Sequence, residues 1–588
     1  MYSSFSDLIL TIYIDQQPGN NNGGLIGILY SSISNIQNIS LNNSFQNNTG
    51  QCGGLLGVVK SILSLLNIQV SNVAINSTGN SGAIIGQSVI SVIMRNIVVD
   101  HSYVESLSYV GGYVAVSDSD VDLYNGITKN SQISSNLNLG GQIGLMQANR
   151  ITVVQNVDAS NVIIISVLTS STGTIVGISL SGTFISVKNA VICDVNISSN
   201  GGGGTGTVVG WSQYNIDVSK CQVNNISIYA TSAGAGGLVG QVSNISSIDN
   251  CKVSDIQITA INHAGGFVGL LNEYTKVTKG NVNNVTIQAN QYAGGIVGVS
   301  KFFVQISQSK VNDSNIKSIA VGGGLIGISN LAIIDQCSVS NISIVSNAQA
   351  AGIIGITYTV SNGSIQVYNV STFNINLKSL TDCSIGSIMG ITYLDVQIQG
   401  AYIYNTSISS FGATGTGGVV GYSLSNISFI GCFVDNLYIN SNAGGSGGII
   451  GHSNITSVIN CSVINSKIIS TRHTGGIIGF QISNITIIDS QVSINSAFVR
   501  NISLISDTYA GGLIGLYDSL MDLQINNSKI NSITINVNNI SQGNIVIGKS
   551  RNTVYLINNS SSNGVNIIND IEQMNCNNLV TTTNLRGC

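Results

Sequence analysis

The chain has 588 residues, of which 7% are charged and 43% are hydrophobic, and its formal net charge is −4. This hydrophobic content excludes intrinsic disorder, which requires low hydrophobicity and high charge. A nearly neutral chain with no basic run and few aromatic residues does not predict nucleic-acid binding. Proline occurs once and glycine 68 times, and the abundance of Ile, Val, Ser, Thr and Asn favours strands joined by polar turns over helices.

Residues 1–20 precede the repeats and predict an N-terminal cap. Residues 5–14 are apolar but contain Asp7 and lack a basic segment, so they make a poor signal peptide. No segment reaches the roughly 18 apolar residues that a membrane helix needs. About twenty Asn-x-Ser/Thr sequences give weak support for secretion.

From residue 21 to residue 548 the chain repeats a motif of two glycines, two apolar residues and a closing glycine. Counting degenerate copies, the motif occurs eighteen times, mostly 28 to 33 residues apart. This period is typical of a stacked solenoid, whereas propeller blades need about 40–50 residues. We expect the glycines to turn the chain sharply with positive φ. A regular strand would point one of the two apolar residues outward, so either the backbone is kinked there or that outward face is covered.

Apolar residues recur at fixed distances from each closing glycine. After Gly240, positions +8, +11, +13, +16 and +18 hold Ile248, Cys251, Val253, Ile256 and Ile258. Residues two apart face inward on a strand, and the three-residue step from +13 to +16, where Asn and Asp recur, predicts a corner. The sequence therefore predicts an all-β fold, a parallel and right-handed β-solenoid of about eighteen coils of about 30 residues, with three short strands per coil.

The motif resembles the GLUG-motif repeats of bacterial and protist surface proteins. The clearest copies are 236–240, 265–269 and 294–298. The resemblance implies a secreted or surface-displayed β-helical stalk of adhesin-like proteins, and it carries over no catalytic residue and no cofactor. The second and closing glycines of these copies, to which we assign structural roles, are Gly237, Gly240, Gly266, Gly269, Gly295 and Gly298.

The +11 position holds cysteine in two pairs of consecutive coils, Cys221 with Cys251 and, within one residue, Cys432 with Cys461. Stacked Cα atoms about 4.8 Å apart fall within the disulfide range, but parallel side chains separate the Cβ atoms by more than the preferred ~3.8 Å. We therefore expect buried, reduced thiols that pack as small hydrophobic groups, with disulfides as the alternative. Cys576 and Cys588, near the C-terminus, are a further candidate pair.

Asp118, Asp120 and Asp122 alternate in the sequence, so a strand would place all three carboxylates on one outward face. They are a weak candidate for a Ca²⁺ site, although the EF-hand pattern fails, and a solvated edge is the favoured interpretation. The four histidines occur singly and predict turn residues. Trp211 predicts either a sugar contact or a side chain that fills an irregular coil.

These observations predict a non-enzymatic extracellular or cell-surface protein, structural or adhesive, that presents long polar faces to glycans or cell-surface proteins. The alternative is a carbohydrate-active β-helix enzyme, similar to polysaccharide lyases or hydrolases, using surface acids such as Asp118, Asp120 and Asp122. We expect no cofactor, no nucleic-acid partner and no membrane span, with lateral self-association as a further option. Residues 549–588 predict a C-terminal cap or tail.

Overall fold

In the computed structural model, the described residues form β-strands and no helix. The structure describes residues 3–5, 8–11, 21–30, 33–147, 149–168, 171–231, 233–358, 363–381, 383–411, 414–442, 444–482, 492–495, 498–518, 523–526, 529–537, 543–544, 547–550, 554–557, 561–563, 565–568 and 573–576. Most of the predicted end segments, 1–20 and 549–588, lies outside these ranges.

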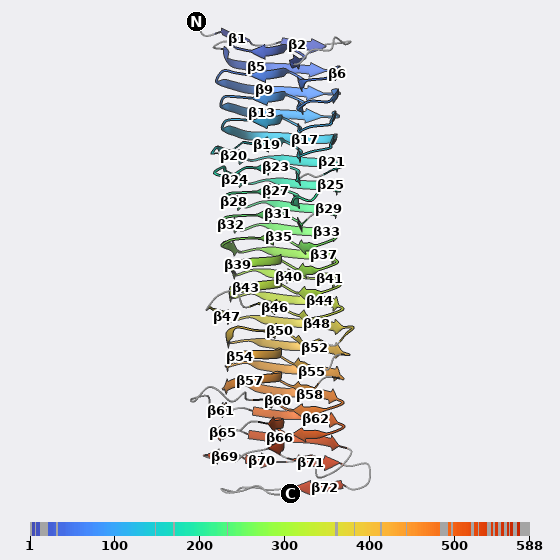
Figure 1. Cartoon of the computed structure of the whole chain (residues 1–588), viewed down its shortest axis with the longest axis vertical. Coiled ribbons are helices and arrows are strands. Elements are labelled where there is room, and N and C mark those ends of the chain that lie inside the picture. The colour runs from blue at the N-terminus through green and yellow to red at the C-terminus, as the bar shows by residue number, and fades with distance from the viewer. Residues whose placement is uncertain are drawn as a thin grey trace. The chain divides into compact units, whose positions relative to one another are not determined.

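The chain forms two compact units. The first comprises residues 1–290 and 295–302, and the second comprises residues 291–294 and 303–588. Both units are parallel β-solenoids, which confirms the predicted fold class, and Figure 1 shows their strands following one another coil by coil. The described residues form about 16 coils. The prediction of eighteen coils counted motif copies, but eighteen copies have only seventeen intervals between them. One of these intervals includes residues 483–491, which lie outside the described residues.

Each coil contains short strands that pair in parallel with the same strands of the neighbouring coils. A coil of the first unit consists of β30 (Gly234–Gly236), β31 (Val239–Val242), β32 (Ser246–Asp249) and β33 (Lys252–Ala260). Its four strands pair in order with β34 (His263–Gly265), β35 (Val268–Leu271), β36 (Thr275–Thr278) and β37 (Asn281–Ala289). In the second unit, β53 (Gly415–Gly417), β54 (Val420–Ile430) and β55 (Phe433–Ser441) pair with β56 (Gly445–Gly447), β57 (Ile450–Ile459) and β58 (Ser462–Ser470).

The core of each unit is a set of stacked apolar rows. Ile248 pairs in register with Val277, and Ile258 with Ile287. All four side chains are completely buried. The offsets deduced from the sequence thus mark the core, because a residue at one offset packs on its equivalent one coil away.

Two corners bend the coil between these rows. The predicted corner between +13 and +16 is confirmed at Asp255, whose φ of 55° is left-handed. A second corner, which the sequence analysis did not predict, lies at Asn250 with φ 51°, between Ile248 and Cys251. Asn and Asp tolerate this backbone region better than other side-chain-bearing residues, which explains their recurrence at both corners.

Corner asparagines also hydrogen bond from coil to coil and form ladders. The amide nitrogen usually donates to the side-chain oxygen of the corner residue in the preceding coil, although Asn130 and Asn465 donate to the aspartate just before that corner, Asp100 and Asp435. At the corner equivalent to Asn250, which comes first in chain order, the ladder of the first unit has N–O distances of 2.9–3.2 Å and comprises Asn38, Asn67, Asn96, Asn125, Asn156 and Asn189. Aspartate can only accept, so it stands at the start of a run, as Asp255 does when it accepts from Asn284 at 2.6 Å.

Replacing a ladder asparagine by aspartate should weaken its coil. In Asn96→Asp the carboxylate no longer donates to Asn67 and instead faces its carbonyl oxygen, so we expect a loss of about 1 kcal/mol. Asp255→Asn is the reciprocal change, because it supplies a donor toward Asn225, and should stabilise its coil. Hydrogen exchange of the two coils would measure both effects, and equal protection in both variants and the parent would contradict the ladder's role.

The motif glycines are required by close backbone approaches and not by positive φ. Among the described glycines, only Gly182, Gly400 and Gly431 have left-handed φ, and none belongs to a motif, so that part of the prediction is wrong. A Cβ added to Gly237 would lie 2.1 Å from the carbonyl oxygen of Gly266, in the following coil. A Cβ on Gly240 would lie 2.1 Å from the nitrogen of Thr205, in the preceding coil.

Both apolar residues inside the motif are buried. Leu238 and Val239 are completely buried, and their successive backbone N–H groups both donate to the carbonyl oxygen of Phe267, at 3.0 and 2.8 Å. This shared acceptor marks a local kink that turns both side chains inward. Of the two predicted alternatives, a kinked backbone or a covered outward face, the structure supports the kink in this coil.

Candidate functional site

The segment after the second corner of each coil presents an outward row of side chains, which we call the trough face. In the second unit this face is built by β41 (Asn315–Ser318), β44 (Ser338–Ser346), β48 (Ser371–Ser379), β52 (Tyr402–Ser410), β55, β58, β62 (Phe498–Ser506) and β66 (Lys529–Val537). Parallel register aligns equivalent residues, so Tyr438, Lys467, Ser503 and Thr534 follow one another on successive coils.

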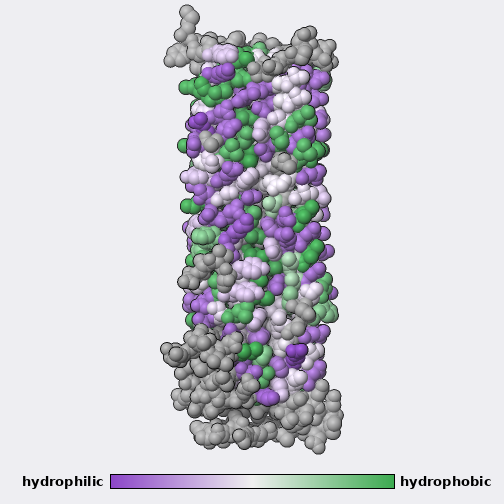
Figure 2. Space-filling view, viewed as in Figure 1, coloured by the Kyte–Doolittle hydropathy of each residue, from purple (hydrophilic) through white to green (hydrophobic). Residues whose placement is uncertain are grey.

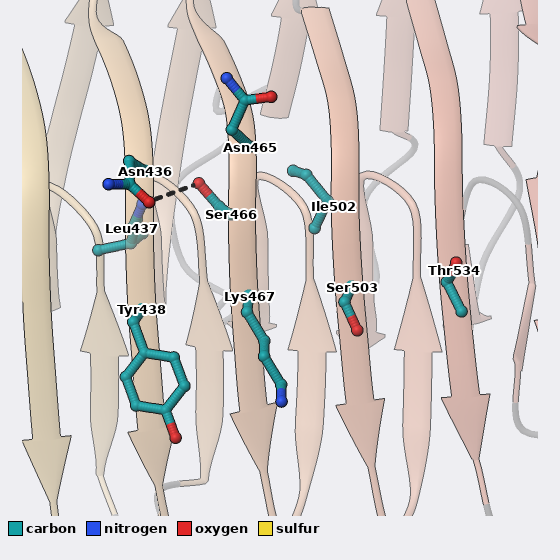
Figure 3. Close-up of a pocket in the computed structure, with 9 residues that line it drawn as sticks. All are labelled: Asn436, Leu437, Tyr438, Asn465, Ser466, Lys467, Ile502, Ser503 and Thr534. Atoms are coloured by element: carbon teal, nitrogen blue, oxygen red, sulfur yellow. Dashed lines mark hydrogen bonds between the residues drawn. The ribbon is translucent and has the colours of Figure 1, made fainter.

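Each unit has a shallow trough on this face. The trough of the first unit has a volume of about 450 Å³ and is lined by Asn161, Asp194, Asn196, Asn225, Ile226, Ser227, Asp255, Ile256, Gln257, Asn284 and Thr286. The trough of the second unit, shown in Figure 3, has a volume of about 460 Å³ and is lined by Asn436, Leu437, Tyr438, Asn465, Ser466, Lys467, Ile502, Ser503 and Thr534. Amide and hydroxyl groups predominate in both, so each trough can exchange hydrogen bonds with a polar ligand.

The second-unit trough combines an aromatic ring, a cation and hydroxyl groups. Tyr438 is 41% exposed, and Figure 3 shows its ring nearly face-on, with Lys467 extending beside it in the same direction. Ser466 is buried next to Lys467 in the sequence, and its hydroxyl accepts from the backbone N–H of Leu437 at 3.2 Å. Asn436 is held by donation to Asn405 at 2.9 Å. Hydrogen bonds thus hold Asn436 and Ser466 in place, while the ring and the ammonium group face outward.

The two troughs differ in charge. The first contains the carboxylates of Asp194 and Asp255, which accept hydrogen bonds from Asn225 and Asn284. Beyond the second corner, the charged outward residues of the second-unit face that the structure describes are Lys317, Lys378 and Lys467. Asp313 stands at the corner itself, and Asp435, just before the corner of its coil, accepts a hydrogen bond from Asn465 at 2.9 Å. The part of this face beyond the corner is therefore positive in a chain of net charge −4.

The surface as a whole is chemically mixed. Figure 2 shows hydrophilic side chains interspersed with small groups of hydrophobic ones on the side in view. Two aromatic pairs lie between the two corners of the second unit, Phe373 with Tyr404 and Tyr402 with Phe433, each with ring centroids 5.2 Å apart. Interplanar angles of 9° and 3° show that these rings stack on one another, so one face of each ring lies against its partner.

Asp118, Asp120 and Asp122 serve local structural roles. Asp118 accepts a hydrogen bond from Gln87 at 2.8 Å, and Asp120 accepts from the backbone N–H of Ile151 in the next coil, also at 2.8 Å. Burial and then the neighbouring Asp120 raise the pKa of Asp122. They do not share one strand, because Asp118 and Asp120 precede β17 (Val121–Ser135). Within the described residues, no group of three or more acidic, His or Cys side chains could hold a metal ion.

The four cysteines singled out in the sequence are buried thiols. Cys221, Cys251, Cys432 and Cys461 are at most 1% exposed and form no disulfide, as expected for small core residues. The stacked pairs interact through sulfur, since Cys461 Sγ accepts from the backbone N–H of Cys432 at 3.3 Å. The suggested partner Cys588 lies outside the described residues.

Trp211 fills a partly buried position. It packs against an apolar cluster of Val116, Leu145 and Ile178, and its indole N–H donates to Ser243 Oγ at 3.1 Å. Of the two alternatives for Trp211, the structure supports the filling role.

A row of histidines and aromatic rings lies beside the motif strands of the second unit. The ring of His452 is 4.5 Å from Tyr422 and 4.7 Å from Phe480, while His473 lies 5.1 Å from Phe480 and 5.5 Å from Tyr509, centroid to centroid. Burial, and then the mutual proximity of the histidines, lowers the pKa of His452 to about 4. Burial followed by Arg472 and Lys549 lowers that of His473 to about 4 as well.

These histidines should make the second unit sensitive to acid. Because the folded-state pKa values lie below the unfolded value of about 6.5, the unfolded chain binds more protons as pH falls from about 6.5 to 4, and stability is lost in that window. We expect His452 to account for about 2 kcal/mol between pH 7 and pH 4.5. His452→Phe keeps an aromatic ring in the row but cannot be protonated, so it should remove this part of the stability lost between pH 7 and pH 4.5. An unchanged pH profile of urea unfolding would contradict the assignment.

Comparison with known proteins gives no relative. A scan against models of protein families finds no match, and a search of curated proteins finds no similar sequence. Within the described part of the chain, no helix has the length and hydrophobicity needed to cross a bilayer.

Proposed function

We propose that this chain is a non-enzymatic, extracellular or cell-surface solenoid of the GLUG-repeat type, structural or adhesive, that presents its trough faces to glycans or proteins. The single observation that carries the proposal is the trough face. There, outward hydroxyl and amide side chains stand in rows at the spacing of the coils, which is about 4.8 Å. A chain polymer of polar units can meet such a row repeatedly, so that weak contacts add up.

The corner ladders support this function by fixing the rows. Asn436 and Asn465, which border the second-unit trough, each donate at 2.9 Å to a side chain of the preceding coil. A surface whose side chains are already ordered loses less conformational entropy when a ligand binds. The resemblance of the glycine motif to GLUG repeats supports display at the cell surface.

The enzymatic alternative is less well supported. Its three candidate acids do not form a paired site in a groove: Asp118 and Asp120 are engaged by Gln87 and by the backbone of Ile151, respectively. Glycosidases place two carboxyl groups on either side of the scissile bond, about 5–10 Å apart. We find no observation in these residues that favours cleavage over binding.

Binding and cleavage can be tested on the same sample. The purified full chain should bind members of a glycan array, or the surface of intact cells, and should leave polysaccharides uncut when reducing ends and unsaturated products are measured. Cleavage that disappears in Asp118→Ala/Asp120→Ala would overturn the proposal in favour of the enzyme. Surface display would be checked by adding protease to intact producing cells, which should degrade the chain.

A further inference from the structure

We propose that the trough of the second unit binds an anionic polysaccharide, carrying carboxylate or sulfate groups, with a sugar ring on Tyr438 and an acidic group beside Lys467. This inference rests on the proposed function and narrows it to one ligand class and one place. It follows from three features of the trough face, namely its charge, the orientation of one ring and the small residues that adjoin them.

The charge of the face favours an anionic ligand. Lys378 lies two coils beyond Lys317, since both pair with Val345 of the intervening strand. Lys467 lies three coils further along, after β52 and β55, in the neighbouring row, because Lys378 aligns through Ser409 and Asn440 with Ile469. At the ~4.8 Å strand spacing the lysines are about 10 and about 14 Å apart along the stack. Exposed cations at such intervals attract a polyanion more strongly than a single charge.

The Tyr438 ring lets the trough distinguish a polysaccharide from other polyanions, which charge alone would not do. Its 41% exposure and its face-on orientation leave a flat apolar surface open to solvent. An aromatic face can pack against the C–H groups of a pyranose ring, while the phenol oxygen remains available for a hydrogen bond. Phe373 and Tyr402 are as exposed as Tyr438, at 41% and 45%, but one face of each of these rings stacks on a second ring, that of Tyr404 or Phe433.

Small polar residues make room for the rest of the ligand. Beyond Tyr438 and Lys467, the same row continues with Ser503 and Thr534, whose short side chains leave the depression open. Their hydroxyl groups can donate to or accept from sugar oxygens. A chain lying along the row would therefore meet the ring first, then the cation, then two hydroxyl groups.

The first unit supplies an internal comparison. Its trough has a similar volume, about 450 Å³, but contains Asp194 and Asp255 and no lysine. A polyanion would be repelled there, so binding is expected at one trough only. Tyr229 on the first unit's trough face is 49% exposed and resembles Tyr438 in exposure, which makes it a suitable control.

The test uses the full chain with four probes: heparin (sulfated), polygalacturonate (carboxylated), dextran (neutral) and single-stranded poly-dT. We expect binding to heparin, polygalacturonate or both, weakening as salt is raised, and weaker or no binding to dextran and poly-dT. Lys467→Gln should weaken binding about two- to fivefold and flatten its salt dependence. Tyr438→Ala should weaken it about tenfold, whereas Tyr438→Phe should retain most of it.

Tyr229→Ala should leave binding unchanged, and thermal unfolding should confirm that the variants remain folded. If poly-dT bound as tightly as the anionic glycans, the inference would be overturned, because the surface would then recognise negative charge and not a sugar. Anionic glycan binding that is insensitive to both Tyr438→Ala and Lys467→Gln would also overturn it, as would equally tight binding of dextran. The last two results would leave the proposed glycan-binding function intact, whereas glycan cleavage would refute that function itself.

Discussion

Gly240→Ala should destabilise the first unit by about 3 kcal/mol or more and release the coils around the substitution. The added Cβ would lie 2.1 Å from the backbone nitrogen of Thr205 and 2.5 Å from both the carbonyl carbon of Gly204 and the carbonyl oxygen of Gly210. These are main-chain atoms held in parallel ladders, so the clash can be relieved only by moving the preceding coil. Hydrogen exchange should show lost protection in the coils on both sides of residue 240.

Gly202→Ala is the matched control for this substitution. A Cβ at Gly202 has no heavy atom within 4 Å, so we expect a change within about 0.5 kcal/mol. If the two variants unfolded at the same urea concentration, the close backbone approach would not be what requires glycine at position 240.

Phe267→Ala should cost about 3–5 kcal/mol, the usual range for removing a buried ring. Phe267 is completely buried in the first apolar position of its motif, and Leu238 occupies the same position one coil earlier. The cavity would open between stacked coils whose main chains are fixed by hydrogen bonds, which limits collapse around it. Urea unfolding followed by circular dichroism would measure the loss.

Two substitutions delimit the effect of the Phe267 cavity. Phe267→Leu should cost no more than about 1.5 kcal/mol, because the position already accepts leucine in the preceding coil. Phe45→Ala should have almost no effect, since Phe45 is 44% exposed. A similar loss in all three variants would show that burial at position 267 is not what stabilises the coil.

The sequence predicted the core well because the core repeats. Offsets read after Gly240 identified Ile248, Val253 and Ile258 as inward residues, and each is completely buried. The corner at Asp255 was recognised because Asn and Asp recur there. The corner at Asn250 was missed because Lys220 and Lys279 stand at its equivalents, and these residues are not typical of left-handed backbone. The three-residue step between Ile248 and Cys251 was the signal that could have revealed it.

The remaining features depend on contacts between coils. The closing glycine was attributed to a turn, whereas its neighbours are backbone atoms about 35 residues earlier, such as those of Thr205. The trough could not be predicted either, because it arises where Tyr438 and Lys467 come into register on neighbouring strands. That juxtaposition depends on the length of each coil and not on a local pattern.

The direction of the asparagine ladders bears on how such a chain can change its length during evolution. Within a run, a ladder asparagine donates to the coil before it and accepts from the coil after it, as Asn96 does between Asn67 and Asn125. A duplicated coil with asparagine at this corner therefore finds a matching acceptor on one side and a matching donor on the other. A coil with aspartate there fits only at the head of a run. Gain or loss of whole coils is thus chemically neutral within a run, and the number of coils can be selected separately from their internal sequence.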